Sequence, residues 1–155
     1  MTILNLTTFL NACENRLVYY NTNEYNLFTN GIVLYACKDD NPNLPKLMDN
    51  IIFDSTGRNQ TTFEPILEAL NNKHRDYVVY HVKGDTTTKV ITKFNESKDL
   101  SIHIANRYYR TIKKKGVKKE FFIITIPFTL KTLECYFSQS LTQDEFIFIM
   151  PNIKK

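Results

Sequence analysis

The fold is decided by residues 120–150, which read EFFIITIPFTLKTLECYFSQSLTQDEFIFIM. The stretch Glu120–Ile126 is apolar at successive positions, as in a central strand covered on both faces. Residues 129–139 carry apolar side chains at helical spacing, and Phe146–Met150 is a second apolar run. Strand, helix and strand in this order predict a C-terminal βαβ unit, in which the two strands would be parallel and joined by a right-handed crossover.

The segments before this unit alternate between helical and extended patterns. Apolar spacing and turn residues predict helices over 3–13, 63–72 and 99–115, strands over 17–20, 32–37 and 51–54, and a β-hairpin of strands 77–83 and 89–94. The sequence therefore predicts a single globular domain over residues 1–155. Its class would be α/β (mixed α+β), with a mixed sheet of about six or seven strands flanked by helices.

Charge divides the chain into two unequal halves. Residues 1–72 hold four basic and eight acidic side chains, a net charge of −4, whereas residues 73–155 hold sixteen basic and eight acidic ones, a net charge of +8. A half with this excess of positive charge favours an anionic partner. A neutral surface in which the two halves attract each other remains the alternative.

Much of the positive charge lies in one short run. Residues 107–119 read RYYRTIKKKGVKK and contain seven of the twenty basic side chains of the chain and no acidic one. Cations near a helix C-terminus oppose the helix dipole, for about 0.3–1 kcal/mol each. This explains two or three lysines beside Gly116 but not seven cations that repel one another, so nucleic acid is the favoured partner.

The spacing of this run predicts which residues would act together. On the expected helix, His103, Arg107, Arg110 and Lys114 recur every three or four residues and would share one face. Tyr109 is expected to be free to stack on a base. The predicted nucleic-acid-binding residues are His103, Arg107, Tyr109, Arg110, Lys113, Lys114, Lys115, Lys118 and Lys119.

Two other interpretations of the charge stay open. The basic face is either simply solvated or the docking site of an acidic protein. The acidic half has its own aromatic density, at Tyr19, Tyr20, Tyr25, Phe28 and Tyr35. Core packing is the expected role of these rings, but exposed rings would make the chain an accessory or inhibitor module that binds a partner protein.

A metal-dependent nuclease is the third alternative. The order of helix 63–72, hairpin and helix 99–115 resembles the restriction-endonuclease-like arrangement, which implies a carboxylate on the first hairpin strand and an acid-x-Lys on the second. Residues 89–93 read KVITK, with no carboxylate two positions before either lysine. A nuclease-like protein without activity is the form of this alternative that the sequence allows.

Signatures of catalysis, cofactors and metals are missing from the sequence. It has no glycine-rich phosphate loop and no nucleophile elbow, and its three histidines lack metal-ligand spacing, so we expect no catalytic residue, cofactor or metal. The cysteines Cys13, Cys37 and Cys135 lie in apolar surroundings and are expected to be reduced core thiols of a cytoplasmic protein. No window approaches the length of a membrane span, so no membrane partner is expected. The abundance of Asn, Lys and Ile suggests an AT-rich viral, phage or plasmid source.

Overall fold

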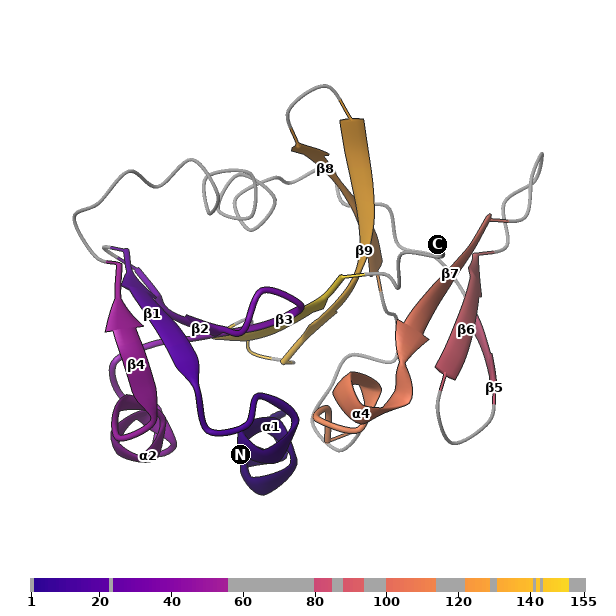
Figure 1. Ribbon diagram of the computed structural model, residues 1–155. Helices are drawn as coiled ribbons and strands as arrows, with labels where there is room; N and C mark the ends of the chain where they lie inside the picture. The colour runs from indigo at the N-terminus through magenta and orange to yellow at the C-terminus, as the bar shows by residue number, and fades with distance from the viewer. Residues whose placement is uncertain are drawn as a thin grey trace.

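The computed structural model describes residues 2–22, 24–55, 80–84, 88–93, 100–113, 122–128, 131–140, 142 and 144–150. Side chains are described for residues 2–22 and 24–55 and for parts of the C-terminal half. The class is mixed α+β with a mixed sheet and few helices, which confirms the predicted class (Figure 1).

Three short helices and ten strands make up the described elements. In chain order they are α1 (Leu6–Ala12), β1 (Leu17–Asn21), β2 (Asn26–Thr29), β3 (Val33–Cys37), α2 (Leu44–Met48), β4 (Ile51–Asp54), β5 (Tyr80–Gly84), β6 (Thr88–Lys93), β7 (Leu100–Ala105), α4 (Asn106–Tyr109), β8 (Phe122–Phe128), β9 (Lys131–Gln139) and β10 (Glu145–Ile149).

The larger sheet is built around strands from both ends of the chain. Its order among the described residues is β4-β1-β2-β3-β10-β9-β8, and β5, β6 and β7 form a separate antiparallel sheet. The pairing of β1 with β4 is parallel, whereas every other pairing in the larger sheet is antiparallel. The C-terminal strand β10 thus lies beside β3 and completes the centre of the sheet.

The core lies on both faces of these central strands. All five residues of β3 and all five of β10 are buried, so neither strand has a solvated face. Alternation places Val33 and Tyr35 on one face and Leu34 on the other. On the first face Phe9 of α1 approaches Tyr35, with a distance of 6.1 Å between the ring centroids.

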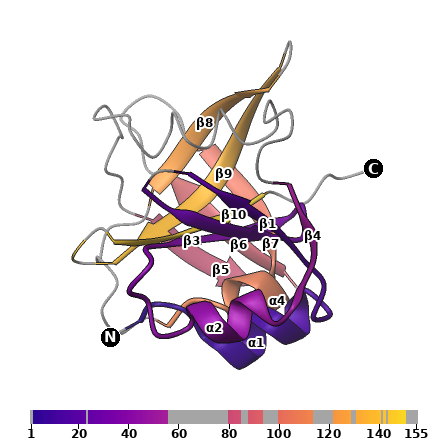
Figure 2. The same cartoon turned by 90° about the vertical axis from the view of Figure 1, so that its left-hand side faces the viewer.

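The described helices gather at one side of the larger sheet. Figures 1 and 2 both show α1, α2 and α4 along the lower side of the structure, with α1 between the other two in Figure 1. Helix α1 buries Phe9 and Leu10, and α2 buries Leu47. Because α4 follows β7 directly and packs near α1, the basic segment begins at this helical layer.

Residues 131–139 form strand β9 rather than the predicted helix. Strand β9 pairs antiparallel with β8 on one side and with β10 on the other, so these three strands form a meander and the predicted βαβ unit is not observed. Leu133, Cys135 and Phe137 also alternate at a spacing of two, and hydrogen bonds to two neighbouring strands favour that pattern.

The predicted helix 99–115 is also wrong over most of the part that the structure describes. Residues 100–105 form β7, which pairs with β6, and only Asn106–Tyr109 are helical. The apolar positions that suggested the helix, from Leu100 to Ile112, are four apart. Four is an even number, so this spacing also suits a strand. The resemblance to restriction endonucleases depended on a helix at 99–115 after the hairpin, and the structure has strand β7 at the start of that range instead.

Several local predictions are confirmed. Helix α1 lies within 3–13, strands β1, β3 and β4 lie at or within one residue of their expected ranges, and β5 pairs antiparallel with β6 as a hairpin would. Strand β2 was not predicted, because residues 21–26, which lead into it, are mostly polar and indicate a turn. The predicted helix 63–72 lies outside the described residues.

Candidate nucleic-acid interface

In residues 106–113 the three cationic side chains are exposed and all the other side chains are buried. Arg107, Arg110 and Lys113 are exposed. The five residues among them are buried, with exposed fractions of 8% or less: Asn106, Tyr108, Tyr109, Thr111 and Ile112. The three cations recur every third residue, so one edge of α4 and of the turn after it presents positive charge to solvent.

The end of this segment, residues 111–113, is paired through its backbone with residues 3–5 near the N-terminus. The Asn5 amide donates to the Thr111 carbonyl at 2.7 Å, and the Lys113 amide donates to the Ile3 carbonyl at 2.7 Å. Between these bonds, Leu4 and Ile112 form an antiparallel bridge. The backbone that carries Arg110 and Lys113 is therefore fixed by pairing with a segment more than a hundred residues away in the sequence.

Arg107 is positioned by its neighbour Tyr108. The guanidinium carbon of Arg107 lies 4.8 Å from the centroid of the Tyr108 ring, a cation–π distance. The Tyr108 hydroxyl accepts a hydrogen bond of 3.0 Å from Nδ2 of Asn30. Asn30 follows β2, so the larger sheet contributes to fixing the ring on which Arg107 rests.

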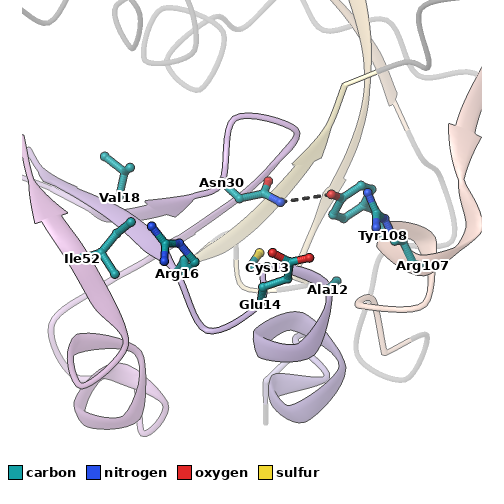
Figure 3. A pocket seen from close by; sticks show the side chains of 9 residues that line it. All are labelled: Ala12, Cys13, Glu14, Arg16, Val18, Asn30, Ile52, Arg107 and Tyr108. Atoms are coloured by element: carbon teal, nitrogen blue, oxygen red, sulfur yellow. Dashed lines mark hydrogen bonds between the residues drawn. The ribbon is translucent and has the colours of Figure 1, made fainter.

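Arg107 and Tyr108 also border a cleft of about 360 Å³. Figure 3 shows Arg107 beside Tyr108 at one end, Arg16 beside Ile52 at the other, and Glu14 between them. The lining residues come from the end of α1, from β1 and β4, from the turn after β2, and from α4: Ala12, Cys13, Glu14, Arg16, Val18, Asn30, Ile52, Arg107 and Tyr108.

The charges in this lining are two arginines and one glutamate. Burial raises the pKa of the Cys13 thiol from 9.0 to about 12. The nearby positive charge of Arg107 lowers this pKa, but its effect is smaller than that of burial. Cys13 is therefore a protonated, buried thiol at neutral pH. Cys37 behaves in the same way, because burial, with Glu145 as a second cause, raises its pKa to about 12.

The predicted site residues are not all brought together. His103 lies on β7, opposite Val90 of β6, and is partly buried, so it shares no helix face with Arg107 and Arg110. Tyr109 is only 8% exposed, and the expectation that it stacks on a base is wrong because its ring packs into the core. The predicted residues Lys114, Lys115, Lys118 and Lys119 lie outside the described residues.

The aromatic residues of the acidic half are largely in the core. Tyr19, Phe28 and Tyr35 are buried, as the core interpretation predicted. Tyr25 is partly buried and packs edge-on against Phe146, with 5.4 Å between the centroids. Cys13 and Cys37 are free and buried, as expected of core thiols.

One buried carboxylate has a structural role. Glu145 on β10 is 3% exposed. Its oxygens accept hydrogen bonds from the Tyr35 hydroxyl, from the Thr2 hydroxyl at 2.5 Å and from the Ile3 amide at 3.2 Å. Asn41 Nδ2 adds a bond of 3.3 Å. With its oxygens engaged in this way, Glu145 anchors the N-terminal residues to the sheet.

Among the described residues, no group of three or more His, Cys, Asp or Glu side chains is placed to hold a metal ion. Within the same part of the chain, no helix is long and apolar enough to cross a membrane. Comparison with protein-family models, with curated proteins and with solved structures yields no match for this chain.

Of the residues that line the cleft, the sequence predicted only Arg107 as a site residue and missed, among others, Glu14, Arg16 and Asn30. Asn30 and Tyr108 are 78 positions apart, and the polar residues of the N-terminal half form no motif that would link them to the basic run. The packing of α1, β1, β4 and the β2–β3 turn around α4 creates the cleft.

Proposed function

We propose that this protein is a non-enzymatic nucleic-acid-binding protein or a subunit of a nucleoprotein complex. Arg107, Arg110 and Lys113 would contact phosphates, and Lys114, Lys115, Lys118 and Lys119 would add electrostatic attraction. The proposal is supported by one observation above all: the three described cations of the segment are exposed while every residue between them is buried.

This arrangement suits phosphate binding for a physical reason. A cation on a fixed backbone loses less conformational freedom on binding than one on a mobile tail. Each phosphate that a Lys or Arg neutralises releases condensed counterions, which supplies sequence-independent affinity. Since Tyr109 is buried, phosphate contacts rather than stacking would carry the binding at this segment.

The salt dependence of binding tests the proposal. Fluorescence anisotropy with labelled single- and double-stranded oligonucleotides would measure the dissociation constant from low to physiological salt. We expect a log–log slope of roughly −0.7 to −0.9 per neutralised phosphate. The double variant Arg107→Ala/Arg110→Ala should weaken binding and reduce the magnitude of the slope by about 1.4–1.8.

Lys46→Ala is the matched control, because Lys46 is an exposed cation on α2 in the acidic half. It should leave affinity and slope within error of the parent chain. Absence of binding at low salt, or equal effects of the control and the double variant, would refute nucleic-acid binding by this segment.

A second candidate function has its own observation. Strand β4 stands at the end of the larger sheet in the described residues, and its Ile52 and Phe53 are 56% and 43% exposed. Apolar side chains on an edge strand suit the addition of a partner's strand. In this alternative, Phe53→Ser would disrupt a protein complex and leave oligonucleotide binding unchanged, whereas Arg107→Ala/Arg110→Ala would do the opposite.

A further inference from the structure

The cleft between α1, β4 and α4 has a size that suits one small ligand. Its volume of about 360 Å³ is near the lower end of the range of small-molecule sites. All nine of its lining residues are described, and they include charged, polar and aliphatic side chains. Figure 3 shows Arg107 and Tyr108 at one end of the cleft, Glu14 in the middle, and Arg16, Val18 and Ile52 toward the other end.

The end at α4 offers hydrogen-bond donors. Oδ1 of Asn30 accepts from the Ile32 amide at 3.0 Å and the Val33 amide at 3.1 Å, so its Nδ2 must point to Tyr108. The Tyr108 hydroxyl accepts that Nδ2 hydrogen bond, which leaves its own proton for another acceptor. With the Arg107 guanidinium beside it, this end presents two donors that suit a phosphate.

The middle and the far end differ from the phosphate-binding end. Glu14, between the two arginines in Figure 3, is an exposed hydrogen-bond acceptor. Its carboxylate would repel a phosphate but would accept hydrogen bonds from sugar hydroxyls. At the far end, Val18 and Ile52 provide aliphatic surface, and the planar guanidinium of Arg16 can stack on a base.

The order of donor, acceptor and stacking surface matches the order of phosphate, ribose and base in a nucleotide. We propose that this cleft binds one ribonucleotide unit, with its phosphate at Arg107 and Tyr108, its 2′-hydroxyl at Glu14 and its base against Arg16 and Ile52. The proposal deepens the nucleic-acid-binding function proposed above and rests on it. It selects RNA over DNA, because only RNA carries the 2′-hydroxyl.

Isothermal titration calorimetry with adenosine 5′-monophosphate, its 2′-deoxy form and adenosine tests each part. The ribonucleotide should bind about tenfold or more tightly than either other ligand, since the deoxynucleotide lacks the hydrogen bond to Glu14 and adenosine lacks the phosphate that Arg107 and Tyr108 would bind. Glu14→Ala should abolish the preference over the deoxynucleotide while leaving phosphate binding intact. Arg107→Ala should weaken nucleotide binding about tenfold and leave adenosine unaffected.

Arg110→Ala is the matched control, because Arg110 is exposed on the same segment but does not line the cleft. It should change nucleotide affinity less than twofold while weakening oligonucleotide binding. A free nucleotide and a strand end are distinguished with short RNA that carries either a 5′-phosphate or a 5′-hydroxyl. Tighter binding of the phosphorylated RNA, lost in Arg107→Ala and retained in Arg110→Ala, would identify the strand end.

Equal binding of the ribo- and deoxynucleotide, no nucleotide binding at millimolar concentration, or equal effects of Arg110→Ala and Arg107→Ala on nucleotide binding would overturn the proposal. Salt-dependent oligonucleotide binding that persists in that case would leave the function of the basic segment standing. Nucleotide binding without oligonucleotide binding would reject the basic segment instead.

Discussion

Removal of the Glu145 carboxylate should destabilise the fold more than any change to an exposed acid. Glu145 is the acceptor for the Tyr35 hydroxyl and the Ile3 amide, and both of these residues are 0% exposed. In Glu145→Ala these two donors lose that acceptor. A buried donor without a partner costs about 1–3 kcal/mol, so the expected loss in the free energy of unfolding from two such donors is about 2–6 kcal/mol. This is a large part of the stability of a typical domain.

Urea denaturation at neutral pH, followed by circular dichroism, would measure this loss. Tyr35→Phe and the double variant complete a thermodynamic cycle, in which direct contact predicts a coupling energy of about 0.5–3 kcal/mol. Glu24→Ala, at an exposed acid, is the control and should stay within about 0.5 kcal/mol of the parent. A loss below about 1 kcal/mol in Glu145→Ala, or strictly additive changes in the cycle, would refute the role assigned to this carboxylate.

Four further predictions concern other described residues. Alkylation followed by peptide mass spectrometry should find Cys13 and Cys37 almost unreactive at pH 8 in the folded chain and reactive in denaturant; rapid labelling of either in the folded chain would contradict their burial. Burial raises the pKa of both thiols from 9.0 to about 12, so as pH rises the unfolded chain loses these protons before the folded chain does. The free energy of unfolding should therefore fall between about pH 9 and pH 12, and these two groups should not affect it below pH 9. Gly31→Ala should cost about 1–2 kcal/mol in urea denaturation, because the Gly31 φ of +96° is unfavourable for a residue with a Cβ although space is open there; an unchanged midpoint would show that the turn relaxes. Tyr109→Ala should destabilise by about 3 kcal/mol or more and Arg110→Ala by less than about 0.5 kcal/mol, and similar losses would contradict the separation of buried and exposed side chains in the basic segment.

The sequence predicted those strands whose apolar residues have a spacing that suits a strand but not a helix. Strand β3, with the residues Val33–Cys37, is apolar throughout, and β5 ends at Gly84, which pairs with Lys89 of β6. Strand β9 was mistaken for a helix, because its choice depends on hydrogen bonds to β8 and β10 that no local window contains. The same limit applies to β7, whose four-residue apolar spacing satisfies both periods.

The candidate site was predictable only in its charges. Arg107, Arg110 and Lys113 are exposed, and composition alone drew attention to them. The burial of Tyr109 could not be foreseen, because it depends on α4 packing against the core rather than on the spacing of a longer helix. Tertiary packing places Arg16 and Asn30 in the same cleft as Arg107, so no local sequence motif predicts them as site residues.

The buried carboxylate and the basic segment are physically connected through residues 2–5. Glu145 binds Thr2 and the Ile3 amide, and the Ile3 carbonyl accepts the Lys113 amide, so one short strap joins β10 to the end of the basic segment. Glu145→Ala should free this strap, so that the Lys113 amide loses its fixed acceptor and its hydrogen exchange becomes faster. The exchange of the Arg110 amide should change less, because this amide donates to the Asn106 carbonyl within the segment. The placement of the cations would then depend on a carboxylate that never contacts the anion.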